Sequence, residues 1–333
     1  MPDAVPTTHP PAFLTGVIAP MFTPVDRDRR LSIPGIHGMV DYLAGTGAVN
    51  TIFARSGMGQ MFSFTAAEAM ILAEAALDAA RGRINVIAGA SGIRTDIVAP
   101  GGPVCDPERY LEQAAMLTQR MEQLGVQAAV HVMPEAYTPR QDENTEDAFY
   151  RYFRTVHDAA SIPVVIYQPG STRPENRMTP ALLSRLLKLP RIAGMKVSTS
   201  SDEVFGPLAD TVRGTAFALI AGDETYYLKA LSQGACGVIG EGCNMWPWIL
   251  RGLAECFRAG DLDGARRAEA DGAAALRAGD GHDHTVLWKQ VMIRRGGAFQ
   301  PFDRNGAEPA SAETVDRATQ EIQRLVAPWI PAD

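Results

Sequence analysis

Residues 191–198 read RIAGMKVS, an apolar run of strand type in which Lys196 is the only charged residue after Arg191. The run does not alternate apolar and polar residues, so a strand here would be buried on both faces. Lysine is among the residues least often buried in proteins. The stretch therefore predicts a strand inside a covered sheet, and it raises the question of why such a strand carries an amine near its end.

Seven further runs of this kind lie along the chain. They are GVIAPMF (16–22), AVNTIF (48–53), INVIAG (84–89), VQAAVHVM (126–133), IPVVIYQ (162–168), AFALIAG (216–222) and ACGVIG (235–240). Continuously apolar strands occur mainly in parallel sheets that are covered by helices. Eight such strands with helical segments between them predict an α/β protein of the (β/α)8 class, the TIM barrel. A doubly wound sheet competes with it, and the lack of G-x-G-x-x-G after the first strand disfavours that architecture.

Helical segments with recognisable ends separate the runs. Residues 65–82 open on Thr65 with Glu68 three residues later, which is a capping-box pattern. Strand-type runs end by residue 259, and only helical patterns follow. The remaining helices are predicted over residues 106–125, 145–160, 179–189, 260–279, 284–296 and 312–327.

This pattern divides the chain into three regions. We expect a flexible, Pro-rich arm over residues 1–13, a catalytic barrel over 14–259 and a C-terminal helical region over 260–333. The Gly- and Pro-rich stretch 90–105 follows the third strand and is long for a connection of this type. It is either a solvated insertion or a loop that covers the barrel mouth.

Composition excludes several classes of function. The chain has 333 residues, a formal net charge of −7 and no run of basic residues, which argues against binding to nucleic acid. No apolar stretch approaches the roughly 18 residues that a membrane-spanning helix needs. The four cysteines form no C-x-x-C pair, and the N-terminus has no signal-peptide pattern. We expect reduced thiols and a cytoplasmic protein.

In a TIM barrel the C-terminal ends of the strands carry the active site, so a lysine at such an end is a candidate catalytic residue. Lys196 lies near the end of the sixth strand and Tyr167 near the end of the fifth. Burial lowers the pKa of an amine from its usual value of about 10.4, and the neutral amine can attack a carbonyl to form a Schiff base. A neighbouring phenol can relay protons. The alternative is a lysine that reaches out to solvent beside a tyrosine that fills the core.

The motifs around these two residues resemble the dihydrodipicolinate synthase and N-acetylneuraminate lyase family of class I aldolases, over residues 14–305. IPVVIYQPG resembles the strand that ends in the catalytic tyrosine, and IAGMKVSTS resembles the strand with the Schiff-base lysine. The resemblance assigns catalysis to Tyr167 and Lys196 and places Gly222, Ile239 and Gly240 beside the substrate. It implies a lyase that acts on a 2-oxo acid such as pyruvate or a 2-keto-3-deoxy sugar acid. It also implies no metal, no organic cofactor and a homo-oligomer, tetramer or dimer.

The chain departs from the family at the loop after the second strand. The family's G-T-T-G-E, which binds the substrate carboxylate, is here SGMGQ, from Ser56 to Gln60. Gly57 and Met58 replace the two threonines, so two hydroxyls are lost. Ser56 offers one hydroxyl from a shifted position, and backbone N–H groups remain able to bind a carboxylate.

Two further departures follow the fourth and fifth strands. The family's P-Y-Y is here Pro134-Glu135-Ala136, and Tyr137 is a candidate replacement for the lost tyrosine. Glu135 is a candidate acid–base group. Arg173 is a candidate contact for a distal carboxylate, because guanidinium binds carboxylates in a bidentate geometry. Each also has a plain alternative as a surface residue. Together the losses argue against dihydrodipicolinate synthase itself.

Two other motifs have structural interpretations. HDH (282–284) is expected to be a polar start of a helix rather than a metal site, and NMWPWIL (244–250) a packing or subunit contact. Three functions stay open. The first is a Schiff-base aldolase or hydro-lyase. The second is a barrel with impaired turnover that binds or senses a 2-oxo acid. The third is an unrelated barrel enzyme such as a phosphate-binding isomerase.

Overall fold

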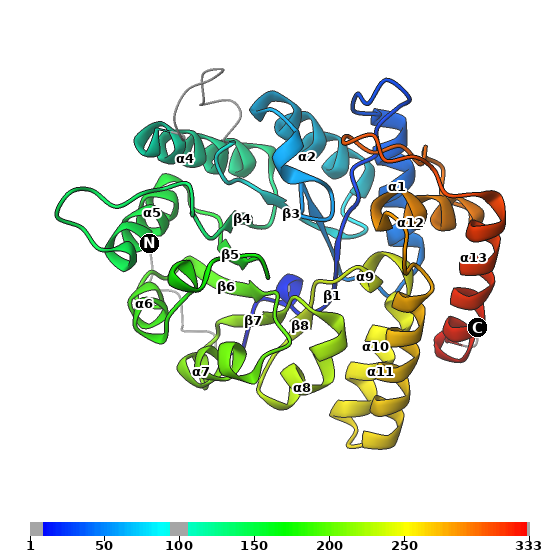
Figure 1. Cartoon of the computed structure of the whole chain (residues 1–333). Helices are drawn as coiled ribbons and strands as arrows, with labels where there is room; N and C mark the ends of the chain where they lie inside the picture. Colours follow the sequence, from blue (N-terminus) through cyan, green and yellow to red (C-terminus); the bar gives the residue numbers. More distant parts are fainter. Residues whose placement is uncertain (1–8, 94–105, 332–333) are drawn as a thin grey trace.

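The computed structural model describes residues 9–93 and 106–331, and its centre is a closed barrel of eight parallel strands (Figure 1). Each strand pairs with the next, and β8 pairs with β1. The strands are β1 (Gly16–Pro20), β2 (Thr51–Ala54), β3 (Asn85–Gly89), β4 (Ala129–Val132), β5 (Val164–Gln168), β6 (Ile192–Val197), β7 (Ala218–Ala221) and β8 (Gly237–Val238). Each strand lies within one predicted apolar run, except that β2 extends one residue beyond its run, and the closed parallel sheet confirms the (β/α)8 fold class.

Helices follow the strands and form the outer layer. They are α1 (Ile33–Gly45), α2 (Ala66–Ala80), α4 (Pro107–Leu124), α5 (Thr145–Ala159), α6 (Pro180–Leu186), α7 (Asp202–Val212), α8 (Tyr227–Ser232), the short α9 (Gly242–Met245) and α10 (Pro247–Arg258). The capping box predicted for α2 is present, with the Thr65 side chain bonded to the Glu68 N–H and the Glu68 side chain bonded back. Because local capping signals decide where a helix begins, these starts are readable from sequence.

Burial on both faces explains the apolar strands. Side chains such as Val165 and Ile220 pack inside the barrel, whereas Met195 and Val197 pack against the helices. Successive residues of a strand point to opposite faces. Lys196 lies between these two outward residues and therefore points into the barrel.

The N-terminal end of the barrel is closed by a short 3-10 helix, η1 (Ala12–Leu14). Leu14 is fully buried among the interior side chains, and Asn50 donates hydrogen bonds to the carbonyl oxygens of Ala12 and Thr15. The arm predicted over residues 1–13 lies largely outside the described residues, and its last two residues belong to this plug. The open end of the barrel is therefore the C-terminal one.

Three helices follow the barrel, as the sequence predicts: α11 (Leu262–Arg277), α12 (His284–Arg294) and α13 (Ala312–Val326). Helix α11 packs on α10, and α13 packs on α11 and α12 (Figure 1). Buried Lys289 of α12 donates hydrogen bonds to the carbonyl oxygens of Thr23 and Phe302, both at 2.7 Å. The C-terminal region is thus fastened to the first quarter of the barrel. Within the described ranges, no helix has the length and apolar character needed to cross a bilayer.

Two glycines of α1 test this docking. A Cβ atom at Gly38 would overlap the backbone carbonyl of Ala298, whereas one at Gly45 meets nothing. Gly38→Ala should therefore destabilise the protein by about 1–3 kcal/mol and lower its thermal unfolding midpoint by a few degrees. Gly45→Ala should leave the midpoint unchanged or raise it slightly. Equal effects of the two variants in differential scanning calorimetry would contradict this docking.

Candidate active site

A cavity of about 900 Å³ opens at the C-terminal ends of the strands. Its walls come from the ends of β2 to β8, and Leu276 of α11 adds to its edge. Lys196 and Tyr167 line it, with only 5% and 9% of their surfaces exposed. The cavity is therefore the place where a small molecule can meet the lysine amine away from bulk water.

Lys196 and Tyr167 are brought together by the register of β5 and β6, in which they are directly paired. Lys196 Nζ lies 4.4 Å from the centroid of the Tyr167 ring. Their burial in the cavity excludes a lysine that extends into bulk solvent. Both catalytic residues predicted from sequence thus share one wall of the cavity, which is the arrangement that Schiff-base chemistry needs.

The loop after β2 presents its backbone to the cavity. Gly57 and Met58 line the cavity, and their N–H groups make no hydrogen bond to another described residue. A Cβ atom on Gly57 would lie 3.2 Å from the Tyr167 hydroxyl oxygen, so the loop passes close to the phenol. The Ser56 hydroxyl is buried, accepts from the Gly59 N–H at 3.0 Å and donates to the Met21 carbonyl. The serine shapes the turn, and the two residues whose N–H groups lack a described partner line the cavity.

Gln60 fastens this loop to the C-terminal region. Its side-chain nitrogen donates to Asp303 Oδ2 and its oxygen accepts from the Arg304 N–H, both at 2.8 Å. Gln60 has a left-handed backbone with φ of 59°, an uncommon conformation for a residue other than glycine. The residue that replaces the family's glutamate is therefore part of a bridge between the loop and the segment after α12.

Arg173 lies on the rim of the cavity and does not line it. Its side chain is 62% exposed, and its Nε lies 3.3 Å from Glu135 Oε1. The same carboxylate oxygen accepts from the Arg173 backbone N–H and from Asn176 Nδ2, both at 3.1 Å. Glu135 lines the cavity as a carboxylate held by three donors. Arg173 was predicted to contact a carboxylate of the substrate. In the structure it pairs instead with a carboxylate of the protein, that of Glu135.

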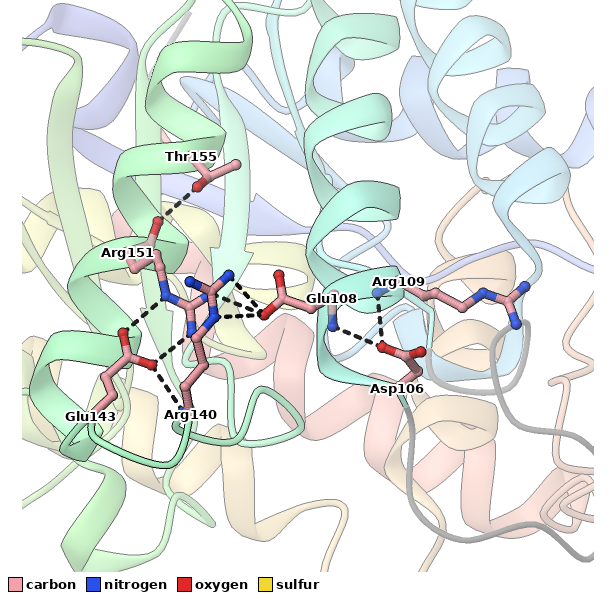
Figure 2. A network of polar contacts seen from close by, with 7 residues as sticks. All are labelled: Asp106, Glu108, Arg109, Arg140, Glu143, Arg151 and Thr155. Atoms are coloured by element: carbon pink, nitrogen blue, oxygen red, sulfur yellow. Dashed lines mark hydrogen bonds and ion pairs between the residues drawn. The ribbon is translucent and has the colours of Figure 1, made fainter.

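Tyr137 also lies outside the cavity lining, although Ala136 beside it is part of that lining. Its side chain is 1% exposed, and the Arg151 guanidinium lies 4.6 Å from its ring centroid. Figure 2 shows the ionic network that holds this arginine, in which Glu143 and Glu108 both contact it. The network fixes the connection between β4 and α5 and keeps Tyr137 packed beneath it.

The ends of β7 and β8 form the remaining wall. Gly222, Ile239 and Gly240, which the resemblance places beside the substrate, line the cavity. Three acidic residues join them, Asp223, Glu224 and Glu241, and no catalytic role was predicted for Glu224 or Glu241. Glu224 lies three residues after the end of β7, in GDE (222–224), and Glu241 lies three residues after the end of β8, in GEG (240–242). Their position just after strand ends, where barrels carry their active sites, could have marked both as site residues.

Burial raises the pKa of Glu224 to about 8, and the neighbouring charge of Glu241 adds to the shift. The site therefore contains a carboxyl group that holds its proton at neutral pH.

The two remaining motifs, HDH (282–284) and NMWPWIL (244–250), pack next to the β8 end of the cavity. His284 of HDH contacts Glu241, with Nδ1 and Oε2 2.9 Å apart. Trp246 packs edge-on against Trp288, with ring centroids 5.6 Å apart. Among the described residues, no group of three or more potential ligands is placed to hold a metal ion. In the 90–105 stretch, residues 94–105 lie outside the described residues, and Gly92 lines the cavity.

Comparison with known proteins agrees with this geometry. The Dihydrodipicolinate synthetase family matches residues 13–100 and 107–275, which is most of the chain. The chain belongs to this family. A 4-hydroxy-tetrahydrodipicolinate synthase of Methylococcus capsulatus (strain Bath) is 28% identical over 262 residues, which are 77% of this chain and 81% of the relative.

Two solved structures share the fold. CdNal from Clostridium difficile, in complex with mannosamine, has a TM-score of 0.79 and 17% identity, with 93% of this chain and 99% of that chain covered. YagE from Escherichia coli K12, in complex with pyruvate, has a TM-score of 0.75 and 22% identity, with 93% and 98% covered. The identities are low, so this chain is a divergent member of the family.

The Gln60 bridge gives a test of how the loop is held. In Gln60→Glu, which restores the acidic residue of the family, the new carboxylate would face Asp303 and lose a hydrogen bond. We expect a lower thermal midpoint at pH 7 and a smaller penalty near pH 4.5, where one carboxylate takes up a proton. The exposed Gln320→Glu on α13 is the matched control. A penalty that is equal in both variants, or that does not change with pH, would contradict the bridge.

Proposed function

We propose that this protein is a class I lyase that binds a 2-oxo acid, such as pyruvate or a 2-keto-3-deoxy sugar acid, as an imine of Lys196. The observation that carries the proposal is the buried Lys196 amine 4.4 Å from the Tyr167 ring inside the cavity. The sequence has four lysines, and Lys196 alone among them lines the cavity. The solved complex of the relative YagE with pyruvate supports the choice of ligand.

We propose a role for each part of this wall. The neutral amine of Lys196 attacks the ketone carbon, and Tyr167 passes protons while the carbinolamine loses water. The free N–H groups of Gly57 and Met58 bind the carboxylate of the 2-oxo acid beside the phenol. Once formed, the protonated imine accepts electrons, so a bond to the next carbon can form or break. The cavity can therefore support aldol addition, cleavage or dehydration.

The charge of the cavity affects which acceptor can react with the bound 2-oxo acid. Glu135, Asp223 and Glu241 line it together with Glu224, and among the described residues that line it Lys196 is the only basic one. Arg173 is paired with Glu135. A second carboxylate on the substrate would meet a repulsion of roughly 1–3 kcal/mol at the effective dielectric constant of a protein surface. We propose an acceptor that is uncharged at its far end, which argues against dihydrodipicolinate synthase activity.

The loss of the threonine hydroxyls and of the family tyrosine, where Ala136 stands, favours one second candidate, a barrel that binds or senses a 2-oxo acid without turnover. In either case we expect a cytoplasmic homo-oligomer, a tetramer or dimer, that needs no cofactor.

Trapping with borohydride tests the imine directly. Incubation with pyruvate and sodium borohydride should add one reduced adduct to Lys196, located by mass spectrometry of the digested protein. Lys196→Ala should give none, and the exposed Lys188→Ala should react as the wild type does. Tyr167→Phe should slow adduct formation by about 10²–10⁴-fold. An adduct without turnover of any aldehyde would favour the sensing protein, and no adduct with any 2-oxo acid would refute both candidates.

A matched pair of aldehydes tests the charge argument. Butanal and succinic semialdehyde have the same carbon number, and only the second carries a carboxylate. With pyruvate as the donor, we expect kcat/KM to be at least about tenfold higher for butanal, because about 1.4 kcal/mol of repulsion corresponds to that ratio. Arg173→Ala should not change the ratio. A preference for succinic semialdehyde that disappears in Arg173→Ala would show instead that this arginine binds the distal carboxylate.

A further inference from the structure

The carboxyl group of Glu224 sits in a cradle built by the GEG motif, residues 240–242. Glu224 begins the 3-10 helix η4 (Glu224–Tyr226), and its Oε1 accepts from the Gly242 N–H at 2.9 Å. A Cβ atom at Gly240 would overlap Oε2, so glycine leaves room for the carboxyl group in its present position. Oε2 accepts no hydrogen bond from the described residues. The residue lines the cavity with 7% of its surface exposed, so this oxygen is the one available to a ligand.

The surroundings of Glu224 favour its protonated form. Burial raises its pKa to about 8, with further increases from the charges of Glu241 and Asp223. The Gly242 N–H and the Lys196 charge act in the opposite direction. The Cys243 thiol also faces this group, and burial raises its pKa far above the usual range, so it stays neutral. Glu224 can therefore donate a proton at neutral pH within the cavity that holds the lysine.

The neighbouring Glu241 is held by helix α12. Its Oε2 accepts from Trp288 Nε1 at 2.7 Å and lies 2.9 Å from His284 Nδ1. The hydrogen bond to Glu241 raises the pKa of His284, burial opposes this shift, and the charge of Asp280 adds to it. The His284 side chain is 29% exposed, so it meets solvent on its other side. In its protonated form, His284 partly neutralises the charge of Glu241 and thereby limits the effect of that charge on Glu224.

We propose that Glu224 is a second acid–base residue of the site, which exchanges a proton with the oxygen of the acceptor aldehyde, and that Glu241 and His284 are positioning residues that set its acidity. This inference rests on the proposed imine chemistry. Tyr167 lies against Lys196 and Gly57 on the β2 and β5 side, whereas Glu224 belongs to the β7 and β8 wall. The phenol serves the imine, and the carboxyl group serves the acceptor.

The proposed step balances in atoms and charge. The enamine carbon of the bound 2-oxo acid attacks the aldehyde carbon and forms the new carbon–carbon bond. The aldehyde oxygen takes the proton of Glu224 and becomes a hydroxyl, which leaves an iminium ion on Lys196 and a carboxylate at Glu224. Water then hydrolyses the iminium ion, and the proton that this releases returns to Glu224. Cleavage is the reverse of this sequence.

Glu224→Gln separates the two roles, because the amide keeps the size and the acceptor oxygen of the side chain. We expect the variant to form the borohydride-trapped adduct with pyruvate at Lys196. It should also exchange the methyl hydrogens of pyruvate in D2O within about threefold of the wild-type rate, measured by NMR. Aldol addition to butanal should fall by about 10²–10⁴-fold, the usual contribution of a general acid. In the wild type the addition rate should fall as pH rises past about 8, and the remaining activity of the variant should lack this decline.

The two histidines of the HDH motif give a variant and its matched control, which together test whether His284 acts as a positioning residue. His284→Gln removes the protonatable ring that neutralises Glu241, so the pKa of Glu224 should rise and the alkaline decline should move to higher pH. His282→Gln changes an exposed histidine two residues away and should leave the profile unchanged. A role of His284 in stability alone would lower the amount of active protein without moving the profile.

Three results would overturn the inference. The first is that the Glu224→Gln variant catalyses the aldol addition of pyruvate to butanal at the wild-type rate. The second is an alkaline decline that persists in that variant, or that the two histidine variants leave unmoved. The third is a wild type that exchanges pyruvate hydrogens but adds no aldehyde, which would leave the imine chemistry intact and remove this role for Glu224. Failure of the proposed function itself would differ, since pyruvate would then form no adduct. If Glu224→Gln does not fold, the histidine pair still decides.

Discussion

The contact between the Lys196 amine and the Tyr167 ring depends on the register of two parallel strands. Because side chains alternate along a strand, one step of slippage between β5 and β6 would turn one of the pair into the helical layer. The apolar residues on both sides of each strand prevent such a slip, since it would expose or displace buried side chains on two faces. The reactive pair is therefore held by the whole barrel rather than by local hydrogen bonds.

The barrel alone does not complete the site. Gln60 is bonded to the segment after α12, Leu276 of α11 lines the cavity edge, and His284 of α12 reaches Glu241. The helices that follow the barrel thus support two parts of the cavity wall, the loop after β2 and the ends of β7 and β8 near Glu224. In this molecule the C-terminal region is part of the architecture of the cavity.

Much of this was readable from the sequence. The eight strands were predictable because burial on both faces leaves continuous apolar runs. The same runs place Lys196 and Tyr167 at strand ends, but a lysine there is a weak signal by itself, and their catalytic roles were predicted from the resemblance of the surrounding motifs. Arg173 illustrates the limit, because its ion pair with Glu135 joins loops that follow different strands. The pairing of Glu241 with His284 spans 43 residues and leaves no local pattern. Such contacts depend on side-chain directions in loops, which neither periodicity nor capping signals encode.

His284 and Trp288, which hold Glu241, belong to helix α12 outside the barrel. Mutations in the strands and mutations in α12 therefore affect different parts of the site. Substitutions at the ends of β5 and β6 act on the Lys196–Tyr167 pair itself. Drift along α12 can alter the electrostatic environment at the far wall while the lysine and the phenol stay where they are. A lineage could in this way adapt to a more acidic or more alkaline habitat by changing an appended helix, and the ancestral reaction would persist.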